Sequence, residues 1–504
     1  MGQYTIKDIE SRAEVLKNDV DNIYRALHTK LGKSPGTLDQ VPQSILDIPD
    51  PLTDEPFTIT PSVDRQEFYA NSDIRYNPIT VEPVTSAIDS NIQPENIKLG
   101  VSILGVMGTL SGSGPGIFAV PNGMKFGYSN FTEIPSNFDF TNVTDMDNLF
   151  ADCIQLTSIP QLNTSSTNSM VRMFANCGSL TAIPQLDTSN VYYMDSMFSG
   201  CGSLTTIPEL NTSSVSNMNN LFNGCNSLTT IPTLNTSSAT SMDNMFANCH
   251  SLTSIPQLDY SNVSSMENIF RECSSLTTIP QLNIPNVGKL NGMFHNCSSL
   301  TTIEGINASS IYSMNSTFEG CSSLTTIPQL DTSNVDSMQS TFANCSSLTT
   351  IPQLDFSRAG DISHLFEGCS NLTTLPQLNT SNAWNMEWLF NFCENLTTVE
   401  GIDFSGLTEE LKFLIGYKTD MSKLTRFIVN GKINVSVPEY NIDMLTAIDY
   451  DSVKSILAAA DRTDNTNAKK LVFNRTMTDQ NGELAALVAS CSTKGWTITG
   501  LTLQ

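Results

Sequence analysis

Basic residues are scarce in this chain. Lysine and arginine total 25 against 50 aspartates and glutamates, which gives a formal net charge of −25 over 504 residues. Residues 143–402 contain only Arg172, Arg271, Lys289 and Arg358 as basic residues. Phosphate backbones and anionic lipid surfaces are bound by clustered lysine and arginine, which this sequence does not supply. The composition therefore argues against nucleic acid and anionic membranes as partners.

Long apolar stretches are missing as well. No run approaches the ~18 apolar residues that a helix needs to cross a bilayer, so we expect no membrane insertion. The first residues lack the basic and apolar regions of a secretory signal. We therefore expect a protein that stays in the cytoplasm where it is made, or one that leaves the cell as part of a larger particle.

Residues suited to metal binding or catalysis are few and scattered. The four histidines lie far apart, and no two cysteines form a Cys-x-x-Cys pair. The Gly-rich segment 111–116 lacks the Lys-Ser/Thr of a phosphate-binding loop, so we interpret it as a hinge. No nucleophile, base and orienting group are recognisable together. We expect no metal, no cofactor and no catalytic residue, and hence no enzyme.

One repeated pattern dominates the sequence. Eleven of the 12 cysteines follow one another at intervals of 24 residues, from Cys153 to Cys393. A phenylalanine precedes each of them by three residues, from Phe150 to Phe390, and a leucine follows each by three. A fixed period of this kind indicates stacked, equivalent units. Thiols in register cannot all pair, so we expect free cysteines buried as small apolar groups.

Each repeat reads as a short strand followed by helical turns. In residues 345–356, apolar residues alternate with threonine, and Pro352 limits the strand because it has no N–H. In residues 331–342, Asp331 opens a turn and the later apolar residues fall on one helical face. We therefore predict an α/β solenoid of leucine-rich-repeat type, with a parallel sheet on one face and short helices on the other.

The remaining segments are assigned by composition. The expected order is an N-terminal helix or coiled coil at 1–35, a linker at 36–56, a small β-rich module at 57–110, the hinge at 111–116, an N-terminal cap repeat at 117–142, eleven repeats at 143–402 and a C-terminal cap at 403–504. The cap repeats are atypical because they must cover an exposed core.

Apolar residues of the N-terminal helix recur at alternating spacings of three and four, as in a coiled coil. The residues expected in this seam are Ile6, Ile9, Leu16, Val20, Ile23 and Leu27. Isoleucine at the d positions disfavours parallel dimers, so a homo-oligomer is expected, with a trimer favoured. The alternative is a single amphipathic helix docked on another surface.

The repeating motif, Met-x-x-x-Phe-x-x-Cys-x-Ser-Leu-Thr-x-Ile, resembles the BspA-like leucine-rich repeats of bacterial surface proteins and of proteins of their phages. The resemblance implies a parallel sheet on the inner face, short helices on the outer face and a role in adhesion. Residues 76–110 resemble a module that recurs in virion fibre and tail proteins of gut phages. This second resemblance implies a place on the surface of a phage particle.

These resemblances favour one function and leave two alternatives. The favoured function is a fibre-like virion protein, on head or tail. Its N-terminal segment would contact other virion proteins, and its solenoid would bind a host cell-surface protein or glycan. The absent leader agrees with this, since phage proteins leave the cell by lysis. The alternatives are a bacterial surface adhesin lacking its leader and a cytosolic repeat scaffold.

Two sets of residues are candidate contacts. Trp384 and Trp388 occupy positions that are polar in other repeats, so we expect them on the outer surface, sharing one face of a short helix. The alternative is that they pack beneath the C-terminal cap or against a neighbouring subunit. Gln329, Gln353 and Gln377 belong to a ladder of evenly spaced amides that suits an extended sugar chain. The alternative there is a solvated sheet edge without a ligand.

Overall fold

The computed structural model describes residues 102–103, 106–107, 118–120, 122–127, 131–134, 138–407, 419–434, 439–463, 469–479 and 481–504. The predicted N-terminal helix with its seam, the linker, the hinge and nearly all of the β-rich module lie outside these residues. The chain divides into two compact units, of which the second, residues 94–101 and 107–504, holds the repeats. In the first described segments, strands β1 (Ser102–Ile103) and β2 (Val106–Met107) pair with each other.

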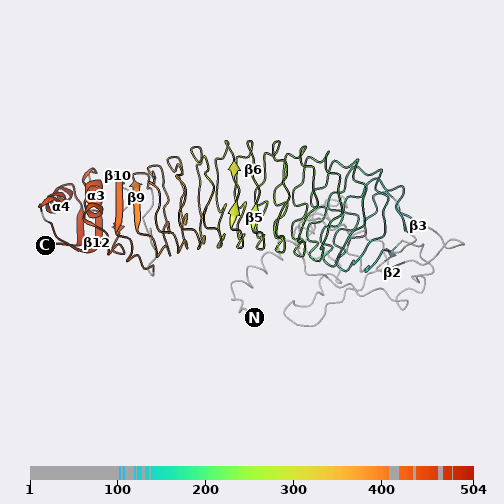
Figure 1. The fold of residues 1–504 in the computed structure, drawn as a ribbon, viewed down its shortest axis with the longest axis horizontal. Helices are drawn as coiled ribbons and strands as arrows, with labels where there is room; N and C mark the ends of the chain where they lie inside the picture. Colours follow the sequence, from blue (N-terminus) through green and yellow to red (C-terminus); the bar gives the residue numbers. More distant parts are fainter. Residues whose placement is uncertain are drawn as a thin grey trace, which may run out of the picture. The chain divides into compact units, whose positions relative to one another are not determined.

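The repeats form a solenoid in which each 24-residue unit makes one coil and the coils stack side by side (Figure 1). A first ladder of parallel backbone bonds runs through the strand half of the repeat, where the Thr301 N–H donates to the Thr277 carbonyl at 2.9 Å. A second parallel ladder links single residues such as Ser313 and Ser337. The predicted leucine-rich-type solenoid with short parallel strands is confirmed, and the pairing occupies two places in each coil.

Only the middle coils pair over enough residues to form regular strands within the repeats. There β5 (Thr278–Ile279) pairs with β7 (Thr302–Ile303), and β6 (Leu282–Asn283) pairs with β8 (Ile306–Asn307), both in parallel. Figure 1 shows β5 and β6 at opposite ends of the same short stretch of coil. A proline separates β5 from β6, which keeps each strand short because it donates no ladder bond.

The short helices predicted for the second half of each repeat are wrong. Ser340 and Asn344 have positive φ angles of 54° and 59°, so the chain makes successive tight turns with a left-handed residue at every fourth position. Alternate amides leave the coil: the Phe342 N–H donates to Leu365 of the next coil at 3.0 Å, whereas the Thr341 N–H turns back to Met338. Turns of four residues bury the same apolar positions as a helix would, so apolar spacing does not distinguish them.

A column of stacked aromatic rings fills the solenoid. The ring of Phe126 stacks on that of Phe150 at a centroid distance of 5.5 Å, and the column continues coil by coil to Phe390. From Phe150 onward these rings are fully buried. Offset stacking contributes roughly 0.5–1.5 kcal/mol per pair beyond the area that it buries. Each added coil therefore extends one continuous core.

The cysteine ladder lies beside this column. The Cys345 thiol donates to the backbone carbonyl of Phe318 at 3.1 Å, and the same bond recurs from Cys153 to Cys393. All twelve cysteines are free and buried. Burial raises the pKa of Cys345 to about 12, so the thiol stays protonated and keeps its donor.

Both ends of the stack are closed by different structures. At the N-terminal end, β3 (Phe118–Ala119) pairs in parallel with β4 (Phe138–Asp139). At the other end, β9 (Thr398–Phe404) pairs in parallel with β10 (Arg426–Ile433). Helix α3 (Tyr450–Asp461) then lies against β10 (Figure 1).

Two serines of α3 cover the open edge of β10. The hydroxyl of Ser452 accepts the Phe427 N–H at 2.8 Å, and the hydroxyl of Ser455 accepts the Val429 N–H at 3.1 Å. The helix thus satisfies amides that another coil would otherwise meet, which prevents pairing with a further strand.

The last part of the cap is a small sheet with one covering helix. Strands β11 (Glu439–Asn441), β12 (Lys470–Met477) and β13 (Thr497–Leu503) form a parallel three-stranded sheet in that order. Helix α4 (Glu483–Thr493) packs against α3 and β13.

The aromatic column and the coil period make separable contributions to stability. We expect Phe270→Ala to lower the free energy of unfolding by roughly 3–5 kcal/mol, because it leaves a cavity between two stacked rings. Deleting the 24 residues 262–285 should instead leave a folded, shorter solenoid, since contacts run mainly between adjacent coils. Urea unfolding followed by circular dichroism measures both, and equal destabilisation by the two changes would contradict this account.

Candidate functional site

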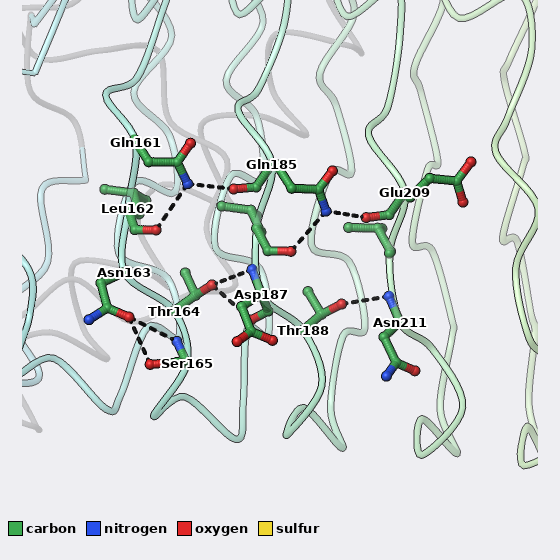
Figure 2. Close-up of a pocket in the computed structure, with 12 residues that line it drawn as sticks. Gln161, Leu162, Asn163, Thr164, Ser165, Gln185, Asp187, Thr188, Glu209 and Asn211 are labelled. Carbon is green, nitrogen blue, oxygen red and sulfur yellow. Dashed lines mark hydrogen bonds between the residues drawn. The ribbon is translucent and has the colours of Figure 1, made fainter.

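The best-formed hollows of the repeats lie along one strip of the coil, between the ladder of glutamines and the turn that follows it. The first has a volume of about 650 Å³ and spans three coils (Figure 2). Its polar lining includes Gln161, Gln185, Glu209, Asn163, Asp187 and Asn211. The second, of about 560 Å³, is lined in the equivalent way by Gln329, Gln353, Gln377, Asp331, Asp355 and Asn379. The three predicted contact glutamines are therefore brought together in one hollow.

The glutamine amides also hold neighbouring coils together. The Nε2 of Gln329 donates to the carbonyl of Gln353 at 2.8 Å, and the Nε2 of Gln353 donates to the carbonyl of Gln377 at 3.1 Å. Gln161 and Gln185 make the same bonds, and in Figure 2 their Oε1 atoms point away from the backbone that the amide nitrogens contact. The ladder thus uses its donors on the backbone and offers oxygen acceptors to a ligand.

The opposite side of each hollow is built from tight turns. The Oδ1 of Asp331 accepts the backbone N–H of Ser333 at 3.1 Å and its hydroxyl at 2.7 Å. These bonds lower the pKa of Asp331 below its ordinary value because they stabilise the carboxylate. Asn163 forms the same turn with an amide oxygen. The recurring aspartates therefore hold turns, a role that an uncharged amide fills equally well.

Buried threonines form the floor of the hollows. The hydroxyl of Thr164 donates to the carbonyl of Asp187 at 2.7 Å and accepts the N–H of the same residue at 2.8 Å. One side chain thereby replaces two rungs of a backbone ladder, at the point where the coil turns away from its neighbour. The hollow is shallow and polar because this hydroxyl takes the place of a larger apolar side chain.

The two predicted contact tryptophans reach the surface in different ways. Trp384 is 43% exposed, and its indole lies over Gly360, where an added Cβ would be 2.6 Å from Nε1. Trp388 is half-buried and has a φ of 60°; its ring stacks on His364 of the preceding coil at 5.9 Å. The prediction that they share a helical face is wrong, because this part of the coil consists of turns.

Exposed tyrosines were missed by reasoning from the sequence. Tyr192, Tyr193 and Tyr312 are each about half exposed and lie on or beside the ladder that carries Trp384. A detectable signal was present for one of them: Tyr312 stands 24 residues after Gly288, as Trp384 stands 24 residues after Gly360. A glycine in one coil leaves room for the aromatic ring of the next.

Other kinds of site find no support in the part of the chain that the structure describes. Within those segments, no three histidine, cysteine, aspartate or glutamate residues lie where they could hold a metal ion together. Among the described helices, none combines the length and the apolar character needed to cross a bilayer.

Sequence comparison places the repeats in a known family. Residues 122–228, 204–304 and 288–400 each match a family model described as Mycoplasma protein of unknown function, DUF285. The matches overlap and together span residues 122–400, more than half of the chain. The chain belongs to this family. The description of the DUF285 family gives no function, and no curated protein sequence matches this member.

Solved structures similar to this DUF285 member are bacterial leucine-rich repeat proteins of low sequence identity. A protein from Bacteroides ovatus is 19% identical with a TM-score of 0.45, and the match covers 77% of this chain and 93% of that chain. A protein from Eubacterium ventriosum is 14% identical with a TM-score of 0.25, covering 67% and 93%. The T. pallidum leucine-rich repeat protein is 20% identical with a TM-score of 0.26, covering 42% and 79%.

The turn aspartates should make stability depend on pH. Serine hydrogen bonds lower the pKa of Asp187, Asp259 and Asp331, so their stabilisation is present above the ordinary value of 3.8 and is lost as pH falls below it. Replacing all three by asparagine preserves the turns without a titrating group. We expect the triple variant to lose less stability than the wild type between pH 7 and pH 3, measured as the midpoint of urea unfolding.

A charge-matched control separates the turns from general electrostatics. Glu209→Gln, Glu304→Gln and Glu394→Gln together remove the same three charges, and none of these side chains makes a hydrogen bond or ion pair among the described residues. This control should lose stability as the wild type does. A control that resists acid as well as the aspartate variant would show that net charge, and not the turns, causes the effect.

Proposed function

We propose that this chain is a binding protein, and not an enzyme, whose solenoid attaches to a cell surface. The observation that carries the proposal is the division of labour in the hollows. The amide donors of the glutamines and the carboxylates of the turns stabilise the coils, so no acid–base pair is left there for chemistry. What remains for a partner is a repeated surface of oxygen acceptors, which suits recognition of an extended molecule.

The chemistry of the strip favours partners that are rich in hydrogen-bond donors. Each hollow offers glutamine Oε1 atoms and turn carboxylates, and the first adds the carboxylate of Glu209. Sugar hydroxyls and the amide or ammonium groups of proteins are donors of this kind. A host cell-surface protein or glycan is therefore the partner that we propose, whereas the acidic surface disfavours nucleic acid.

We further propose that the chain is a fibre-like component of a phage virion, exposed on the surface of the particle. The support is the resemblance of residues 76–110 to modules of gut-phage fibre and tail proteins. The N-terminal segment would contact other virion proteins and form a homo-oligomer, with a trimer favoured by its heptad pattern. A bacterial surface adhesin and a cytosolic scaffold remain the alternative functions for the same solenoid.

Adhesion can be tested with the full-length protein and a panel of gut bacteria. We expect saturable binding to at least one strain, measured by flow cytometry of fluorescently labelled protein. Glu209→Arg should reduce that binding about tenfold, because it places a cation among the acceptors of the first hollow without removing a hydrogen bond of its own side chain.

The matched control for adhesion is Glu394→Arg, which makes the same charge change at an exposed residue that lines neither hollow of the strip. It should bind cells as the wild type does, and all three proteins should unfold at the same temperature. Equal losses in the two variants would mean that total charge decides attachment. Failure of the wild type to bind any strain would contradict the adhesion proposal.

The virion placement needs a separate measurement. Antibodies against the solenoid, coupled to gold, should label purified phage particles from a culture that produces this chain, at a fixed position on head or tail. Mass spectrometry of the same particles should detect its peptides. Label on bacterial surfaces alone would favour the surface adhesin, and label confined to the cytoplasm would favour the scaffold.

A further inference from the structure

We propose that a second site, separate from the glutamine strip, binds a single ring of a neutral sugar beside Tyr312. The site is a hollow of about 390 Å³ on the ladder that carries the exposed aromatics. Its lining residues include Ser264, Glu267, Asn286, Lys289, Ser310 and Tyr312. The inference deepens the proposed adhesive function, on which it rests, by naming the ligand class and the place.

The aromatic wall of this site is made possible by a glycine. Tyr312 is 47% exposed, and its ring lies against Gly288 of the preceding coil, where an added Cβ would overlap Cε1 and approach Cδ1 at 2.9 Å. The backbone fixes this placement, because the Tyr312 N–H donates to the Gly288 carbonyl at 2.8 Å. An aromatic ring held in this way offers its electron-rich face to the polarised C–H groups of a sugar ring.

The polar wall offers mainly acceptors. The Ser264 hydroxyl donates to the carbonyl of Thr240 at 3.2 Å, and the Ser310 hydroxyl donates to the carbonyl of Pro285 at 2.9 Å. The Nδ2 of Asn286 also donates to a backbone carbonyl, at 2.8 Å. With these donors engaged, the hydroxyl and amide oxygens retain lone pairs for a ligand. Sugar hydroxyls supply the donors that such oxygens accept.

The charges in the site favour a neutral ligand. Lys289 is one of the few cations of the repeats, and its Nζ lies 3.3 Å from Oε1 of Glu267 in the preceding coil. The pair balances its own charge, so neither an anion nor a cation gains from entering. The ammonium group has three N–H donors, of which the carboxylate takes one, so that others can reach the ring or hydroxyl oxygens of a sugar.

Saturation-transfer NMR of the full-length protein tests the site directly. The probes are the methyl glycosides of glucose, galactose, mannose and N-acetylglucosamine. We expect transfer to at least one of them, and about tenfold weaker binding in Tyr312→Ala, which removes the aromatic face. Gly288→Ala should weaken binding similarly, because the new methyl group displaces the ring while the tyrosine itself remains.

Gly360→Ala is the matched control, since it displaces the ring of Trp384 at the equivalent position three coils further along. It should leave sugar binding unchanged, as should Tyr312→Phe, which keeps the aromatic face. Thermal unfolding shows whether each variant keeps its fold. Loss of binding in Gly360→Ala equal to that in Gly288→Ala would overturn the proposal, because the effect would then come from distorted coils.

The sugar site and the adhesive function can fail independently. A wild-type protein that binds bacteria but transfers saturation to none of the four glycosides would eliminate the sugar site and leave adhesion standing. A protein that binds a glycoside through Tyr312 but attaches to no cell would support the site and contradict the adhesive role.

Discussion

Registered stacking of coils is the constraint on which the rest of this structure depends. Each coil directs half of the amides of its turn segment to the next coil, so no coil can satisfy its own backbone alone. The same translation carries one phenylalanine onto the next at 5.5 to 6.1 Å and one thiol onto the next carbonyl. A residue at a repeating position is therefore selected first for how it meets its own copy one coil away.

This constraint explains why the most regular polar residues are poor guides to function. The glutamines, the turn aspartates and the buried threonines recur because each of them bonds to the neighbouring coil or holds a turn. Specific recognition is more readily built where the repeat is broken. Glu209 replaces a glutamine, Lys289 replaces a small polar residue, and Tyr312 follows a glycine. Such departures give individual coils chemistry that the consensus coil lacks.

A stack with open ends would continue to add strands, and the C-terminal cap shows how this is prevented. Helix α3 takes the position that the next strand would have and meets the amides of β10 with two serine hydroxyls. Ser452 is fully buried, and Asp449 caps the helix by accepting its N–H. The change from coil to helix at this point satisfies the edge with side chains, which cannot template another coil.

The sequence by itself determined the period, the solenoid and the buried identity of the repeating residues, because Phe342 and Cys345 recur at a spacing that only stacked equivalent units require. It did not determine the turns. The spacing of Val335, Met338 and Phe342 fits a helix as well as two tight turns, and only the bonds from alternate amides to the next coil decide between them. The candidate sites depended still more on tertiary structure. Gln353 and Tyr312 are read alike as exposed polar or aromatic residues, yet the folded coils engage the amide of Gln353 and place Tyr312 on a glycine, because contacts between coils join residues that the chain separates by 24 positions.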